Sequence, residues 1–310
     1  MQLKQLSTRS VTKAIFFGNY FYGLCVAALS VEAGLQQQFP LNSILFYMLS
    51  FIATVLYYTR AYLPAKNTNS INPRTKWYAD NKKEILLSQW LLGIIFLACS
   101  FIYLYRHYHG LLQLPLSNSI LLIIFPLVAA FYYGLDHQFA GDKGLRRIGW
   151  LKPFIIGFIW AGIVTVYPVV FSGVENANNY YHFNIVGTFL FIKNFMFITV
   201  LCIMFDIKDY ATDSNQQIKT FVVNVGLRRT IFSIILPLSA LGLGSFLIVA
   251  FIRGFSPMMI LLNLVPFICL ITVAYSMYRR QPILYYLMII DGLMVLKGIC
   301  GSVAMYFFWR

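Results

Sequence analysis

Three aspartates, Asp206, Asp209 and Asp213, are the residues whose type and spacing best suit chemistry. They are separated by three and then four positions, so on a helix their carboxylates line one face over two turns. Like charges held together repel one another unless a cation neutralises them. Mg²⁺ typically joins one or two carboxylates to the phosphates of a substrate. The spacing therefore favours a magnesium and diphosphate site with these aspartates as metal ligands.

Basic residues surround the three aspartates. They are Lys208, Lys219, Arg228 and Arg229, whose side chains can donate charge-assisted hydrogen bonds to phosphate oxygens. The alternative is an exposed acidic turn that pairs with these bases through weak surface salt bridges. Spacing alone leaves both interpretations open.

The composition indicates which kind of element positions this cluster. The chain of 310 residues is 59% hydrophobic and only 11% charged, whereas soluble domains carry about 25% charged residues. A span needs roughly 20 apolar residues. Nine apolar runs approach or exceed this length, near 14–31, 42–60, 85–105, 116–135, 153–172, 184–205, 231–252, 257–276 and 283–308. The sequence therefore predicts an all-α integral membrane protein, one helical bundle of nine transmembrane helices over residues 1–310.

The distribution of positive charge predicts the orientation. With a cytoplasmic N-terminus, nineteen of the twenty-four Lys and Arg residues fall on the cytoplasmic side, as the positive-inside rule requires. We expect the protein in a bacterial inner membrane, where its net charge of +14 meets anionic lipid heads and not nucleic acid. The long polar loops after the second and sixth runs then share the cytoplasmic face.

Three further charges lie inside apolar runs, where each is costly. Lys193 precedes Asp206 by thirteen residues, about 20 Å along a helix, too far to join the aspartates. Asp291, in the last run, is expected beneath the aspartates and paired with a cation. Lys297 lies six positions further on and points to a different face. These residues predict either buried ion pairs or the ion path of a transporter.

The segment from Asp206 to Gly226 resembles the second aspartate motif of the UbiA superfamily of intramembrane prenyltransferases. That motif reads D-x-[KR]-D-x-x-x-D, followed by a glycine, a Lys-Thr pair and a later glycine. The residues in step with it are Asp206, Lys208, Asp209, Asp213, Lys219, Thr220 and Gly226, while Gln217 stands where the family usually has glycine. The family's nine spans, cytoplasmic N-terminus and active-site loops after spans two and six are similar to the layout above.

The first aspartate motif of the family, N-D-x-x-D-x-x-x-D, is absent. Aligned on Asn72, Pro73 and Arg74, its Asn and Asp positions fall on Ala61, Tyr62, Ala65 and Asn69. In one interpretation, nearby cations replace a second metal and Asn69 remains as an oxygen ligand. Those cations are Arg60, Lys66, Arg74 and Lys76. In the other, the chain is a catalytically inactive binding protein of the same fold.

The resemblance implies Mg²⁺-dependent transfer of an isoprenoid from a polyprenyl diphosphate to an aromatic or other lipophilic acceptor, with release of diphosphate. It implies Asp206, Asp209 and Asp213 as metal ligands and catalytic residues. The substrate contacts expected with it are Lys208, Lys219, Arg74, Arg146, Asn69, Tyr133 and Tyr210. Tyr58 and Trp160 join Tyr133 and Tyr210 as candidates to line the path of the carbocation through cation–π attraction.

Overall fold

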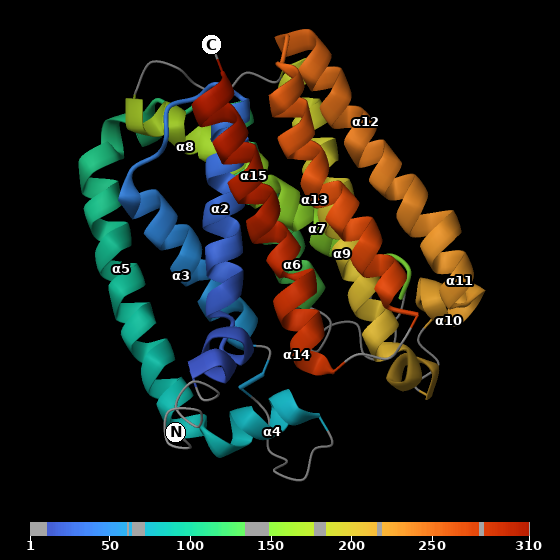
Figure 1. The fold of residues 1–310 in the computed structure, drawn as a ribbon. Coiled ribbons are helices and arrows are strands. Elements are labelled where there is room, and N and C mark those ends of the chain that lie inside the picture. The colour runs from blue at the N-terminus through green and yellow to red at the C-terminus, as the bar shows by residue number, and fades with distance from the viewer. Residues whose placement is uncertain are drawn as a thin grey trace, which may run out of the picture.

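The computed structural model describes residues 11–60, 62–63, 72–133, 149–176, 184–215, 219–278 and 282–309, with the side chains of residues 133, 211 and 212 left out. These residues form helices and turns and contain no strand, which confirms the all-α prediction. Most helices run along one common direction as a bundle (Figure 1). The α-helices are α2 (Tyr20–Gln36), α3 (Ile44–Arg60), α4 (Pro73–Asp80), α5 (Lys82–Leu112), α6 (Leu116–Tyr133), α7 (Lys152–Ala161), α8 (Tyr167–Asn176), α9 (Ile185–Asn215), α10 (Phe221–Val225), α11 (Leu227–Thr230), α12 (Leu236–Arg253), α13 (Pro257–Ser276), α14 (Ile283–Tyr285) and α15 (Gly292–Phe308).

Within the described ranges, six helical segments are long and apolar enough to cross a membrane. They are Lys82–Leu112, Lys152–Asn176, Ile185–Tyr210, Leu227–Arg253, Pro257–Ser276 and Ile283–Phe308. A seventh crossing results if the helix Val11–Phe17 and α2, which meet at a 63° bend, are counted together. α3 and α6 overlap two further predicted runs but are shorter. The protein is therefore an all-α membrane protein, and the predicted count of nine spans goes beyond what the helix lengths establish.

The bend before α2 has a local cause. Asn19 takes a left-handed conformation with φ of 66°, which asparagine tolerates better than most residues because its short side chain can hydrogen-bond locally. The preceding Gly18 completes the break between the two helices. As a result, the carbonyl of Phe17 is left to accept hydrogen bonds from side chains.

Two of the prolines in the apolar runs follow π-helical turns. The turn η3 (Gly162–Val166) precedes Pro168 and the turn η4 (Ile231–Ile235) precedes Pro237. Proline lacks a backbone N–H and its ring clashes with the carbonyl four residues earlier, so a wider turn relieves both problems. A third π-helical turn, η5 (Tyr286–Ile290), ends immediately before Asp291 without a proline.

α9 is the central helix of the bundle. It packs against α7 and α12, while α15 packs against α2 and α13. The contact between α15 and α2 is close because a Cβ atom on Gly298 would lie only 2.7 Å from the Ala28 backbone, and glycine permits such an approach. By contrast, only 11% of the apolar window of α5 is buried, and α5 lies at one edge of the bundle (Figure 1).

One end of the bundle carries the short helices. α4, α10, α11 and α14 all lie at the lower end in Figure 1, together with the C-terminal part of α9. We call this the α4 end. The helices that follow α3 and α9 in the chain, α4 and α10, therefore lie on the same side of the molecule. The sequence predicts this arrangement for the two long polar loops.

Candidate functional site

The three aspartates lie on the last turns of α9 at the α4 end, but in different environments. Asp206 is 1% exposed and Asp213 is 9% exposed, whereas Asp209 is 42% exposed. Helix geometry agrees with the difference. At 100° per residue, positions 206 and 213 point within about 20° of each other, whereas 209 lies about 60° from 206 and about 40° from 213. Two carboxylates therefore face inward and one lies at the surface.

Among the described residues, Lys152 is the cation that pairs with this inward face. Its Nζ lies 3.2 Å from Oδ1 of Asp206, and its charge also acts on Asp213. Lys152 begins α7, whose start is fixed by Pro153, a residue suited to the first turn of a helix. The sequence alone did not predict this lysine as a partner of the aspartates, although it precedes Pro153 at the start of an apolar run.

The backbone after α9 returns to the start of α7. A Cβ atom on Gly149 would lie 2.7 Å from the Lys219 carbonyl carbon and 2.8 Å from the Thr220 nitrogen. Only glycine permits this contact, which holds the Lys-Thr pair of the motif against the segment that leads to Lys152. The Thr220 side chain is buried, and Lys219 is exposed.

Three buried oxygens in this region have no hydrogen-bond partner among the described residues. They are Oδ2 of Asp206, Oδ2 of Asp213 and Oγ1 of Thr220. Buried polar atoms are normally paired, so these oxygens are suited to bind a cation or a hydrogen-bond donor. Two carboxylate oxygens fit the one or two carboxylates that Mg²⁺ typically uses with substrate phosphates. No group of three or more acidic, histidine or cysteine residues that could hold a metal occurs in the described part of the chain.

The protonation of Asp213 reflects this crowding. Burial raises the pKa of the Asp213 carboxyl above its ordinary value, and the neighbouring charge of Asp209 raises it further. Lys152 and Lys208 act in the opposite direction and lower that pKa. A bound cation would favour the charged form in the same way.

The predicted substrate contacts around α9 are at the surface. Lys208 pairs with Asp209, with Nζ 3.0 Å from Oδ1. Tyr210 is 47% exposed, so its ring is not buried with the carboxylates of Asp206 and Asp213. Arg228 and Arg229 are exposed near the end of the same loop. These groups contact solution, whereas Asp206 and Asp213 are buried.

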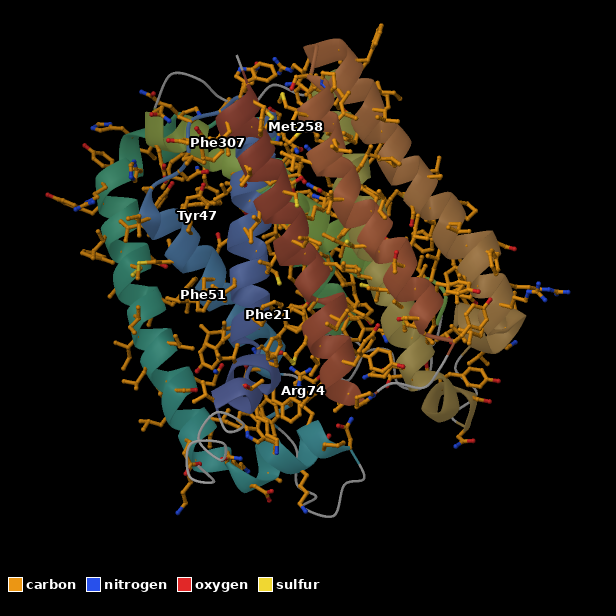
Figure 2. The ribbon with its side chains drawn as sticks, viewed as in Figure 1. Phe21, Tyr47, Phe51, Arg74, Met258 and Phe307 are labelled. Carbon is orange, nitrogen blue, oxygen red and sulfur yellow. The ribbon has the colours of Figure 1, made fainter. Side chains whose placement is uncertain are left out.

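Arg74 lies where α4 meets the bundle and points inward (Figure 2). It is 5% exposed. Its Nη2 donates to the Phe17 carbonyl at 3.1 Å and to Oδ1 of Asn19, and the Tyr62 ring lies 4.2 Å below the guanidinium. Tyr78 also donates to the Phe17 carbonyl, at 2.9 Å. In this structure Arg74 thus fastens α4 to the bend before α2.

Several predicted residues lie outside the described residues. These are Asn69, Lys66, Ala61, Ala65, Arg146 and the side chain of Tyr133. Arg60 and Lys76 are described and exposed. Tyr58 and Trp160, two of the proposed aromatic residues, do meet: Nε1 of Trp160 donates to the Tyr58 hydroxyl at 2.5 Å.

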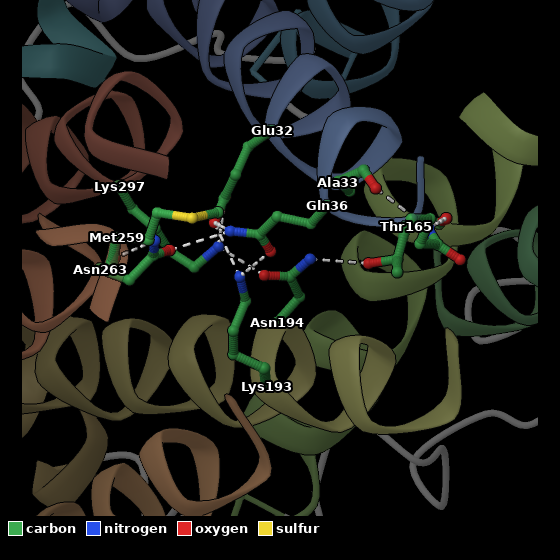
Figure 3. A network of polar contacts seen from close by, with 10 residues as sticks. Glu32, Ala33, Gln36, Thr165, Lys193, Asn194, Met259, Asn263 and Lys297 are labelled. Carbon is green, nitrogen blue, oxygen red and sulfur yellow. Dashed lines mark hydrogen bonds and ion pairs between the residues drawn. The ribbon is translucent and has the colours of Figure 1, made fainter. Parts of the chain in front are cut away.

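The intramembrane lysines form a separate network deeper in the bundle (Figure 3). Lys193 and Lys297 both bind the buried carboxylate of Glu32, with Nζ to oxygen distances of 2.7 and 2.5 Å. Lys193 also donates to Gln36 and Lys297 to Asn194. The prediction that Lys193 does not pair with the aspartates agrees with these contacts. Glu32 itself was missed, although a carboxylate directly after the first apolar run was signal enough to expect a partner.

Comparisons of the chain with protein-family models, curated proteins and solved structures found no match.

Proposed function

We propose that this protein is a UbiA-type polyprenyltransferase of the bacterial inner membrane, which transfers an isoprenoid from a polyprenyl diphosphate to an aromatic or other lipophilic acceptor. In this proposal the chain crosses the membrane nine times with a cytoplasmic N-terminus, so that α3, α6 and the bent first segment each count as a span. The α4 end is then cytoplasmic.

The observation that carries the proposal is the pair of buried, unpartnered oxygens on Asp206 and Asp213 beside Lys152. Both carboxylates are buried and come from one helix. Magnesium bound by Asp206 and Asp213 would supply positive charge against the diphosphate as it leaves. Asp209 would assist from the surface, where it now pairs with Lys208.

The chain's own residues have two tasks in such a reaction. Lys152, Lys208 and Lys219 orient the diphosphate through charge-assisted hydrogen bonds. The apolar core beneath α9 excludes water from the allylic carbon. When the allylic C–O bond breaks, its electron pair leaves with the diphosphate. The acceptor then forms the new bond to the allylic carbon and gives up one proton, which the diphosphate takes.

The proposal is tested by binding of labelled polyprenyl diphosphates of several lengths to the purified protein in detergent. We expect magnesium-dependent retention that falls at least tenfold in Asp206→Asn and in Asp213→Asn, and that chelator abolishes. Asp80→Asn, which changes an exposed aspartate of α4, is the matched control and should bind like the wild type. Retention that needs neither magnesium nor the two carboxylates would contradict the proposal.

Turnover with an extracted lipid fraction separates an enzyme from an inactive binding protein of the same fold. Release of labelled diphosphate together with a prenylated lipid supports the enzyme. Magnesium-dependent binding without any product supports the binding protein, in which loss of the first aspartate motif has removed catalysis.

A transporter is the second candidate, favoured by the network of Glu32, Lys193 and Lys297 in the bundle interior. Ionisable groups inside a membrane often mark an ion path. Its test is ion flux into vesicles that contain the protein: flux that Glu32→Gln abolishes would support transport. The absence of flux in a preparation that binds polyprenyl diphosphate would favour the prenyltransferase.

A further inference from the structure

The ion pair between Lys152 and Asp206 is asymmetric. Asp206 is 1% exposed, whereas the Lys152 side chain is 36% exposed. The Lys152 Nζ contacts only Oδ1 of Asp206, and Oδ2 of Asp206 and of Asp213 have no hydrogen-bond partner among the described residues. The buried carboxylate is therefore fixed on α9, while its cation is carried by a long, flexible side chain that reaches the surface.

The charges at this inward face do not balance. Asp206 and Asp213 carry two negative charges when ionised, and Lys152 supplies one positive charge that acts on both. Mg²⁺ carries two positive charges and takes oxygen ligands such as these carboxylates. Once the metal binds Asp206 and Asp213, no negative charge remains on them to hold the Lys152 ammonium. The metal and the lysine therefore compete for Asp206.

The position of Lys152 in α7 adds to this competition. Lys152 is the first residue of α7, and the first turn of this helix contains no acidic residue. The helix dipole places partial positive charge at this end, which disfavours a cation and favours an anion. Without the charge of Asp206, the lysine therefore attracts an anion together with the start of α7.

No other described cation is placed in this way. Lys208 pairs with Asp209 at the surface. Asp291 is also buried, and the sequence predicts that it pairs with a cation, but it has no ion-pair partner among the described residues. Arg74 and Lys208 act on Asp291 only at longer range. Within the described ranges, Lys152 alone joins a buried aspartate of the α4 end to the surface.

We propose that Lys152 is an exchangeable counter-ion that pairs with Asp206 in the metal-free protein, is displaced by Mg²⁺, and then pairs with the diphosphate of the substrate. This inference rests on the proposed function and adds an order of events to it. The metal releases the lysine that the diphosphate needs, so each ligand strengthens the binding of the other, as linkage requires. In the metal-free protein Lys152 stays on Asp206, which keeps the site closed to diphosphate.

The test measures how fast a water-soluble acetylating reagent modifies the Lys152 amine in the full-length protein in detergent. Mass spectrometry of peptides reports the rate at each lysine. We expect the rate at Lys152 to rise at least threefold when Mg²⁺ alone is added, because the amine leaves Asp206. Inorganic diphosphate added with Mg²⁺ should lower it again at least threefold. Lys83, exposed on α5, is the internal control and should react equally in all three samples.

Two variants separate the ion pair from the metal. Asp206→Asn removes the partner of Lys152, so this amine should react rapidly even without Mg²⁺. Asp213→Asn removes a metal ligand but leaves the ion pair, so Lys152 should stay slow without Mg²⁺ and respond less to it. A rate at Lys152 that Mg²⁺ does not change in the wild type overturns the proposal, and this measurement needs no variant to fold. A metal-free rate in folded Asp206→Asn equal to that of the wild type also overturns it.

The affinity for Mg²⁺ alone gives an opposite sign for a merely structural lysine. If Lys152 competes with the metal, Lys152→Gln should bind Mg²⁺ at least threefold more tightly in calorimetry. If Lys152 only supports the shape of the site, the same variant should bind Mg²⁺ more weakly, and that result overturns the proposal.

The exchange and the proposed function fail separately because these measurements use no prenyl substrate. Release of Lys152 by Mg²⁺ in a protein that retains no polyprenyl diphosphate supports the exchange and contradicts the proposed function. Magnesium-dependent retention of polyprenyl diphosphate with no change at Lys152 keeps the proposed function and overturns the exchange.

Discussion

Replacing Glu32 with glutamine should destabilise the protein more than any other single neutral substitution in the bundle interior. Glu32 is the carboxylate shared by Lys193 and Lys297, at 2.7 and 2.5 Å, and all three side chains are at most 3% exposed. Glutamine preserves the size of the side chain but removes its charge. Two ammonium groups would then remain close together without a counter-ion.

The magnitude follows from the cost of leaving a buried charge unpaired. Breaking a buried ion pair by removing one partner costs about 3–5 kcal/mol, a large fraction of the 5–15 kcal/mol that stabilises a typical domain. At roughly 2 °C per kcal/mol for a long chain, the unfolding midpoint should fall by roughly 6–10 °C. Glu84→Gln, at an exposed position of α5, is the matched control and should shift it by at most about 1–2 °C.

Lys297→Met makes the argument refutable. It leaves Glu32 paired one to one with Lys193 and keeps an unbranched side chain, but it removes the contacts of Lys297 to Glu32 and to Asn194. A lost hydrogen bond to a charged group costs about 1.5–3 kcal/mol. We therefore expect it to be milder than Glu32→Gln and to restore part of the stability when combined with it. Thermal unfolding of the four proteins in one detergent measures this. If Glu32→Gln unfolds at the wild-type temperature, or if Lys297→Met lowers the unfolding midpoint equally, the charge of Glu32 does not stabilise the bundle.

Three further predictions use the same unfolding measurement. Gly301→Ala should cost about 1–3 kcal/mol, because its Cβ would lie 2.5 Å from Cγ of Glu32; an unchanged midpoint would show that the two helices separate freely. Lys152→Met should lower the free energy of unfolding by about 1–2 kcal/mol, less than for a fully buried pair because this lysine is one-third exposed. Adding Asp206→Asn to the same chain should restore most of that free energy. Burial raises the folded-state pKa of Asp213 above its ordinary value of 3.8, so without magnesium the wild type should lose stability as the pH rises from 3.8 through the raised value. Asp213→Asn should then be more stable than the wild type at neutral pH, and this gain should disappear as the pH falls toward 3.8.

The positions of the helices could be predicted from the sequence, because a membrane helix must satisfy its own backbone and be apolar along its length. Every predicted run overlaps a helix of the structure. The number of crossings could not be obtained in the same way. α3 contains 17 residues, and the first run is interrupted at Asn19, where one backbone conformation changes the direction of the chain.

The candidate site was predictable only in part. The spacing of Asp206 and Asp213 was sufficient to place both carboxylates on one face of α9. Spacing could not show that Lys152 would face them, because that contact depends on how α7 packs against α9. Arg74 is a similar case. The polar loop around it suggests exposure, yet its guanidinium is buried because it donates a hydrogen bond to the Phe17 carbonyl at the bend before α2.

The buried network and the α4 end are linked because the same three helices build both. α2 contributes Glu32 to the network and Tyr22 to the α4 end, and α9 contributes Lys193 and Asp206. α15 contributes Lys297, six residues after Asp291. Ion pairs in a low-dielectric interior lose energy steeply when their partners move, so the network fixes how these helices slide and rotate against one another. Since side chains on a rigid helix move with it, that fixed register also sets how Tyr22, Asp206 and Asp291 are presented at the other end.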